Sequence, residues 1–184
     1  MIKHTIAILG LAGALALGGC SEGSGGGGSN VYIPLPNDFI PFREWTRIFL
    51  GDGPLEGHPA GPRYGYVKIK PGPTEYPIGA IIVKTVESGT PQQWDVFAMA
   101  KRGGGYNAGG ATNWEFFTMI INDSDTAIIV NAGTNPQDAD RDAGLGHGYS
   151  DPSGTGITCN RCHGVAGTER SDHILSPLLA PGAL

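Results

Sequence analysis

Apolar segments separated by turn-forming residues make up the middle of the chain. Five segments there are rich in β-branched and aromatic residues, which predicts strands over 63–70, 78–87, 93–101, 113–121 and 126–131. Clusters of Gly, Pro, Asn and Asp separate them, and we interpret the Gly-rich one at 103–110 as a hairpin connection. Consecutive short strands with turns between them predict an antiparallel β-sheet meander. The expected fold class is therefore α+β, mainly β.

The spacing of apolar residues is different before the first predicted strand and after the last one. Apolar residues spaced three and four apart follow Asn37-Asp38 and predict an N-terminal helix over 41–49. After Asn131 the chain is irregular and Gly-rich, which predicts a long loop leading to a pair of cysteines. Ser171-Asp172 is expected to cap a short C-terminal helix that Pro177 ends.

The first nineteen residues have the composition of an export signal. Lys3 precedes an apolar run over 6–17 that ends in small residues and is too short to be a comfortable membrane span. The following Leu17-Gly18-Gly19-Cys20 resembles the bacterial lipobox, in which the Cys is lipidated; the alternative is a plain secretory signal with a chance Cys after it. Ser21 directly follows that Cys, and by resemblance to such lipoproteins it indicates an anchor in the outer membrane. We therefore expect an exported protein that is lipid-anchored on the periplasmic side.

Residues 20–30 then form a lipidated Cys and a Gly/Ser tether, and 31–184 form one domain. The tether sequence SEGSGGGGS behaves as a flexible coil with a reach of about 15–18 Å. Removing residues 1–19 leaves 184 − 19 = 165 residues, which fits a single core. A net charge of −5, with 16% charged residues and no basic stripe, argues against a nucleic-acid partner.

The remaining two cysteines occur in one motif, Cys159-Asn160-Arg161-Cys162-His163. Two thiols at this spacing, followed directly by His, are the attachment pattern of a c-type haem. Cys159 and Cys162 would form thioethers to the vinyl groups, and His163 would be the axial ligand of the iron. The alternatives are a surface disulfide and half of a zinc site, although a zinc site requires four ligands and the chain has no further Cys to supply them.

The opposite side of the iron has several candidates for a second ligand. They are Met99, Met119, His58, His147 and His173. The two Met residues lie in predicted strands and are more often core residues, and His58 and His147 lie in Gly-rich loops. A five-coordinate, open iron therefore stays an alternative.

Lys84 lies on an apolar strand face. Two-residue periodicity puts it beside Ile82 and Val86, where a lysine is unusual. The alternative is an edge position in which the stem covers the sheet and the ammonium reaches water.

Six segments occur in a characteristic order. They are FREW at 42–45, YPIGAIIVK at 76–84, the strand at 94–101, NWEFF at 113–117, the Cys-His motif and DHILSP at 172–177. Together they resemble the cytochrome P-460 family, which shares its fold with the beta-type cytochromes c-prime. The resemblance implies a mainly antiparallel β domain, often a homodimer, with a haem open to small nitrogen compounds.

The resemblance also implies roles on the distal side of the haem. Lys84 falls where the family has a lysine crosslinked to the macrocycle, and Arg63 falls near its distal arginine. Hydroxylamine-oxidising members place a carboxylate at the position that Phe97 occupies here, whereas an aromatic ring is found in the gas-binding members. Asp95 and Glu115 are the carboxylates that we consider as substitutes.

Three functions are consistent with these features. The first is an enzyme that oxidises hydroxylamine, with nitric oxide chemistry, and passes electrons to a soluble acceptor such as a cytochrome; Lys84 favours it. The second is a non-catalytic protein that binds nitric oxide, which Phe97 favours. The third is a simple electron carrier, which needs a strong sixth ligand.

Overall fold

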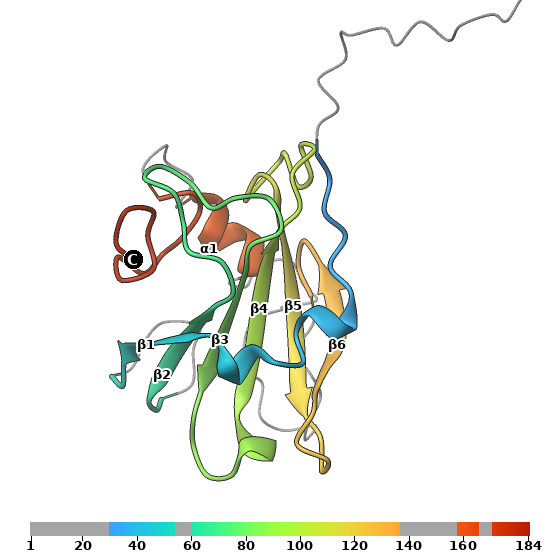
Figure 1. Cartoon of the computed structure of the whole chain (residues 1–184), viewed down its shortest axis with the longest axis vertical. Helices are drawn as coiled ribbons and strands as arrows, with labels where there is room; N and C mark the ends of the chain where they lie inside the picture. Colours follow the sequence, from blue (N-terminus) through green and yellow to red (C-terminus); the bar gives the residue numbers. More distant parts are fainter. Residues whose placement is uncertain (1–29, 54–59, 137–157, 166–170) are drawn as a thin grey trace, which may run out of the picture.

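The computed structural model describes residues 30–53, 60–136, 158–165 and 171–184, and it is built around one sheet (Figure 1). Six antiparallel strands follow one another in chain order across this sheet. They are β1 (Thr46–Gly51), β2 (Arg63–Val67), β3 (Ile81–Val86), β4 (Asp95–Lys101), β5 (Trp114–Ile121) and β6 (Ala127–Gly133). The predicted mainly β meander is confirmed, and 102–113 is the predicted hairpin connection between β4 and β5.

The predicted N-terminal helix over 41–49 is wrong. Short 3-10 turns form at η1 (Pro36–Asp38) and η2 (Phe42–Glu44), and Trp45 is already extended, with φ −77° and ψ 175°. β1 follows and pairs with β2. Spacings of three and four fitted a helix, but Thr46, Ile48 and Phe49 are also good strand formers, and pairing along β2 outweighs local propensity.

The predicted C-terminal helix is wrong as well. Residues 171–184 form turns, in which Asp172 and His173 have φ angles of +46° and +64°. A right-handed helix cannot continue through such angles. The helix of this region is instead α1 (Cys159–Val165), which contains the Cys-His motif. A third 3-10 turn, η3 (Pro91–Gln93), precedes β4.

Several sequence predictions fall outside the described residues. They concern the export signal at 1–19, Cys20 and the tether, His58, His147, and the part of the predicted long loop at 137–157. Within the described ranges, no helix has the length and the apolar character that crossing a membrane requires.

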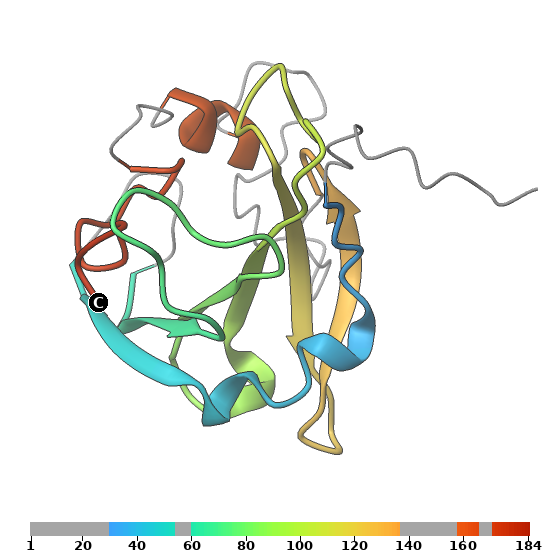
Figure 2. The ribbon, with the colours of Figure 1, turned by 45° about the horizontal axis from the view of Figure 1, so that its top comes forward.

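The sheet has two covered faces (Figure 2). The N-terminal segment crosses one of them, where Phe39 and Phe42 pack on Ile81, Val83 and Phe117; we call it the N-terminal face. The other carries α1 and the C-terminal segment, and we call it the helix face. On it, register aligns Gly65, Lys84, Phe97 and Thr118 across the four central strands.

The N-terminal face carries much of the stability that the site depends on. Phe117 is 3% exposed, and its ring centroid lies 4.9 Å from that of Phe39. We expect Phe117→Ala to lower the free energy of unfolding by about 3–5 kcal/mol, because it removes a buried ring and leaves a cavity. Denaturant titration measures this. Ile128→Ala on the exposed side of β6 is the control, and equal losses in both variants would contradict the assignment of the core.

Candidate functional site

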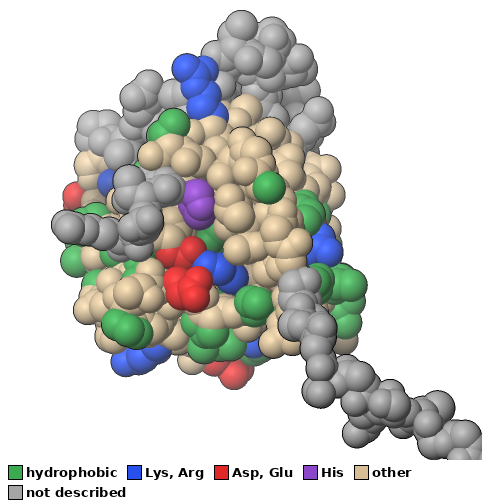
Figure 3. All heavy atoms as spheres, turned by 90° about the horizontal axis from the view of Figure 1, so that it is seen from above, with side chains coloured by type: hydrophobic (Ala, Val, Ile, Leu, Met, Phe, Trp, Pro, Cys, Tyr) green, Lys and Arg blue, Asp and Glu red, His purple; other side chains and the backbone are tan. Residues whose placement is uncertain are grey.

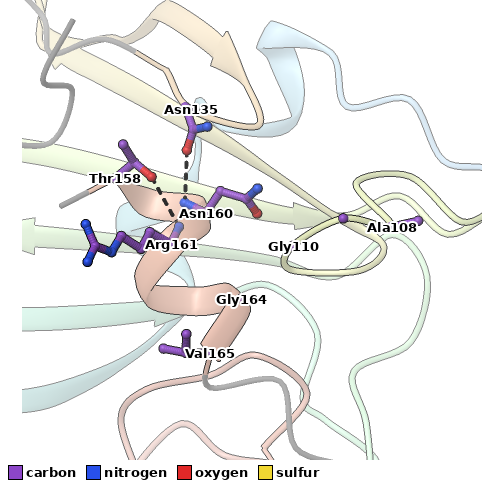
Figure 4. Close-up of a pocket in the computed structure, with 9 residues that line it drawn as sticks. Ala108, Gly110, Asn135, Thr158, Asn160, Arg161, Gly164 and Val165 are labelled. Carbon is purple, nitrogen blue, oxygen red and sulfur yellow. Dashed lines mark hydrogen bonds between the residues drawn. The ribbon is translucent and has the colours of Figure 1, made fainter. Parts of the chain in front are cut away.

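Helix α1 is held at its start by side chains from two segments. The Thr158 hydroxyl oxygen accepts a hydrogen bond from the Arg161 amide at 3.2 Å, and Asn135 Oδ1 accepts one from the Asn160 amide at 3.2 Å (Figure 4). These two bonds satisfy N–H groups that the first turn of a helix leaves without a partner inside the helix. The helix therefore begins at Cys159, the first residue of the motif.

The two faces of α1 have different surroundings. Cys159, Cys162 and His163 are spaced three and four apart and so share one face. Cys159 packs against the core cluster of the helix face, and the His163 ring centroid lies 5.1 Å from that of Phe116 on β5. The motif thus faces the sheet.

The opposite face of α1 borders an open hollow. Its volume is about 550 Å³, and Asn160, Arg161, Gly164 and Val165 line it together with 108–110 of the β4–β5 connection (Figure 4). Neither cysteine of the motif lines this hollow, and His163 does not line it either. Any group bonded to the two sulfur atoms would therefore lie on the sheet side of α1.

His163 has a defined orientation. Its Nδ1 lies 2.7 Å from the carbonyl oxygen of His173, and His173 Nδ1 lies 2.9 Å from the carbonyl oxygen of His163. A carbonyl can only accept, so Nδ1 of His163 carries the proton and Nε2 keeps a lone pair for a metal. Burial lowers the pKa of His163 to about 4, against the opposing hydrogen bond to His173, and the charge of Lys84 lowers it further. The imidazole is neutral at pH 7.

Lys84 lies in the middle of the helix face. It is paired with Gly65 on one side and Phe97 on the other, and its Nζ lies 5.1 Å from the centroid of the Phe97 ring. The residue as a whole is half-buried, whereas its amine is strongly desolvated, which lowers its pKa to about 7. Neutral and charged forms are therefore both populated near pH 7. The edge position that the sequence left open is excluded, because β3 is an inner strand.

Electrostatic interactions connect Lys84 with the motif. Cys159 and Cys162 each raise its pKa, against the dominant effect of burial, and Arg63 lowers it. Arg63 is 6% exposed, and its guanidinium donates to the carbonyl of Gly53. The structure thus gathers the motif, Lys84 and Arg63 on one face of the sheet, although they are far apart in sequence.

Phe97 and Asp95 complete the group on this face. Both are half-buried on β4 and point to the same side as Lys84, and Asp95 raises the pKa of Lys84. Lys84, Asp95 and Phe97 are partly exposed. On the other side of the same two strands the side chains are buried, as at Val83, Val96 and Ala98. Lys84, Asp95 and Phe97 are thus partly accessible, whereas Ile82, Val86 and Met99 beside them on the same face are buried.

Other predicted residues lie elsewhere. Glu115 points to the N-terminal face and pairs with Arg102 at 3.2 Å, and Met119 belongs to the core of that face, so neither is brought to the motif. Met99 is on the helix face but is buried in its core. His173 lies beside His163 rather than across the site.

Two residues of the site were not predicted from the sequence in the roles that they have. Phe116 contacts the His163 ring, and Asp172 anchors the turn that contains His173. The two-residue alternation of β5 could have placed Phe116 on the face of Met99. Asp172 was expected only as part of a helix cap, and its hydrogen-bond partners are distant in the chain.

The contact between α1 and the β4–β5 connection tests how the helix is held in place. Asn160 Oδ1 accepts hydrogen bonds from Asn107 Nδ2 at 2.7 Å and from the amide of Ala111 at 2.9 Å. Asn160→Ala leaves the Ala111 amide without this acceptor, so we expect a loss of about 1–3 kcal/mol in the free energy of unfolding. Asn107 Nδ2 keeps the carbonyl oxygens of Ala111 and Trp114 as acceptors. Val165→Ala on the same helix removes an 81% exposed side chain and should cost under about 0.5 kcal/mol. Equal effects of the two variants, measured by denaturant titration, would refute the docking role.

The surface around this end of the molecule has no single dominant charge. Seen from the side of α1, acidic and basic side chains lie next to each other around a histidine (Figure 3). Comparison of the chain with protein-family models, with curated proteins and with solved structures finds no match. The geometry of the helix face is therefore the basis for assigning a function.

Proposed function

We propose that the chain is a c-type haem protein of the cytochrome P-460 type that oxidises hydroxylamine and passes the electrons to an acceptor. Cys159 and Cys162 would hold the haem, and His163 would bind its iron. One observation carries this proposal. The motif faces the sheet, where Lys84 on β3 is close enough for its charge to lower the pKa of His163.

The residues on the helix face suit such a group. Cys159 and Cys162 lie on the same side of α1 as His163, so all three side chains could hold one haem from that side of the helix. The neutral His163 ring has its Nδ1 proton bound by a carbonyl, which leaves Nε2 for iron. When bound, the haem would supply a redox-active iron that takes small nitrogen compounds as ligands.

Lys84 supports a modified haem. The bond that the family resemblance implies joins the lysine nitrogen to a meso carbon of the macrocycle. Lys84 would hold the macrocycle through a neutral amine nitrogen. Desolvation at this position lowers the lysine pKa to about 7, which supplies the neutral form.

Asp95 is the carboxylate that we propose as proton acceptor. Oxidation of hydroxylamine releases protons together with electrons, so a base near the substrate speeds the reaction. Asp95 shares its strand face with Phe97 and interacts electrostatically with Lys84. Arg63 would contribute positive charge to the same side of the site.

A second function is favoured by Phe97. Its ring is the direct cross-strand neighbour of Lys84, where a bulky apolar group restricts access and accepts no proton. A protein of this kind would bind nitric oxide without turnover, like the beta-type cytochromes c-prime. A simple electron carrier is less well supported, because the two Met candidates are core residues and His173 lies beside His163.

Spectra and turnover of the holoprotein separate these functions. The enzyme should show strongly shifted bands of a crosslinked haem and reduce an added electron acceptor when hydroxylamine is supplied. Ordinary five-coordinate c-haem bands with tight nitric oxide binding and no turnover would favour the second function. A low-spin six-coordinate spectrum would favour electron transfer.

We also propose that the protein is exported and anchored to the periplasmic side of the outer membrane through lipid on Cys20, and that it forms a homodimer. The lipobox-like sequence before Cys20 supports the anchor. Labelling with a radioactive fatty acid tests it, and Cys20→Ser should abolish the label. Label retained in that variant would contradict the anchor.

A further inference from the structure

A buried ion pair lies behind the turn that contacts His163. The Lys101 ammonium and the Asp172 carboxylate are hydrogen-bonded, and their side chains are 4% and 8% exposed. Asp172 also accepts a hydrogen bond from the Tyr76 amide at 2.8 Å and one from Trp114 Nε1 at 3.4 Å. Four segments of the chain therefore meet at one carboxylate.

The backbone next to this carboxylate is in a conformation that needs support. Asp172 and His173 are consecutive residues with φ angles of +46° and +64°, in the left-handed region that side chains other than Gly rarely adopt. Such angles persist where surrounding contacts fix them. Asp172 supplies three such contacts, to Lys101, Tyr76 and Trp114. Two more come from the Ile174 amide, which donates to the Ser171 carbonyl, and from the His173 ring, whose Nδ1 lies 2.9 Å from the His163 carbonyl oxygen. The His173 carbonyl in turn lies 2.7 Å from His163 Nδ1.

We propose that Asp172 is a positioning residue for the axial ligand: its buried contacts with Lys101, Tyr76 and Trp114 fix the turn whose His173 carbonyl binds the Nδ1 proton of His163. This inference rests on the proposed function, since it assigns His163 to the iron. A firmly held carbonyl orients the ring and raises the basicity of Nε2. A loosened turn would weaken that hydrogen bond without touching the iron itself.

Asp172→Asn in the holoprotein is the main test. The amide has the same shape and can still accept from Tyr76, but it no longer carries the charge that holds Lys101. We expect the iron–histidine stretching band in the Raman spectrum of the reduced protein to broaden and move to lower frequency. We also expect the reduction potential to rise, because a less basic ligand stabilises the oxidised iron less.

Glu75→Gln is the matched control. Glu75 is also a partner of Lys101, at 3.4 Å, but its side chain is 70% exposed and it contacts the same ammonium from solvent. This variant should leave both the band and the potential at their original values. If Asp172→Asn does not yield holoprotein, the band and the reduction potential are measured in the double variant Lys101→Met/Asp172→Asn. This variant leaves no buried charge without a partner.

The outcomes separate this inference from the proposed function. An unchanged band and potential in Asp172→Asn, or in the double variant, would overturn the positioning role. So would equal shifts in Asp172→Asn and Glu75→Gln. A wild-type protein that carries no haem after maturation in a c-type cytochrome host would instead overturn the haem proposal.

Discussion

Replacing Cys159 and Cys162 together by Ser should abolish covalent attachment of haem. Both side chains are half-buried thiols on the sheet side of α1, and a hydroxyl does not form the thioether that the motif is built to make. The denatured variant should have the mass of the polypeptide alone, and acid acetone should extract any haem that remains bound. Mass spectrometry and extraction of protein matured in a c-type cytochrome host measure both effects.

Cys20→Ser is the matched control for this experiment. It changes the third cysteine of the chain by the same substitution, at a position that the proposal assigns to lipid. Haem content should be unchanged in this variant. Haem that resists extraction in the Cys159→Ser/Cys162→Ser protein to the wild-type level would show that the motif is not its attachment site.

Replacing Lys84 by Met should convert the modified haem into an ordinary c-type haem. Methionine matches the length of the lysine stem and suits the half-buried position, but it has no nitrogen to bond to the macrocycle. The absorption bands of the reduced protein should move to those of an unmodified c-haem. The rate of hydroxylamine oxidation should fall at least about tenfold, which corresponds to ~1.4 kcal/mol or more of transition-state stabilisation.

Lys70→Met provides the comparison. Lys70 is an exposed lysine that follows β2, so the variant removes the same group from an exposed position. Its spectrum and activity should match the wild type. If Lys84→Met kept the wild-type bands while Lys70→Met did too, Lys84 would not be bonded to the haem, and the nitric oxide-binding function would become the better assignment.

The strands were predictable from the sequence because each carries a local signal. Residues 81–86 and 114–121 are rich in β-branched and aromatic residues and lie between turns, so β3 and β5 were found within a few residues. β1 was missed because Thr46 to Phe49 satisfies both helical and strand spacing. Only the presence of β2 alongside it decides between the two.

The site was predictable in part. Cys159, Cys162 and His163 are contiguous, and Lys84 is conspicuous on an apolar strand, so local sequence identifies both. Their meeting across the sheet depends on how α1 docks, through Asn160 and the β4–β5 connection, which no local pattern encodes. Asp172 was missed as an anchor for the same reason: its partners Tyr76, Lys101 and Trp114 lie on other segments.

Peptide mass mapping of the denatured, protease-digested holoprotein tests whether one haem is bound by the motif on α1 and faces Lys84. We expect one haem joined to the fragments that contain Cys159 and Cys162 and, through a third bond, to the fragment that contains Lys84. A Cys159–Cys162 disulfide without haem would contradict it.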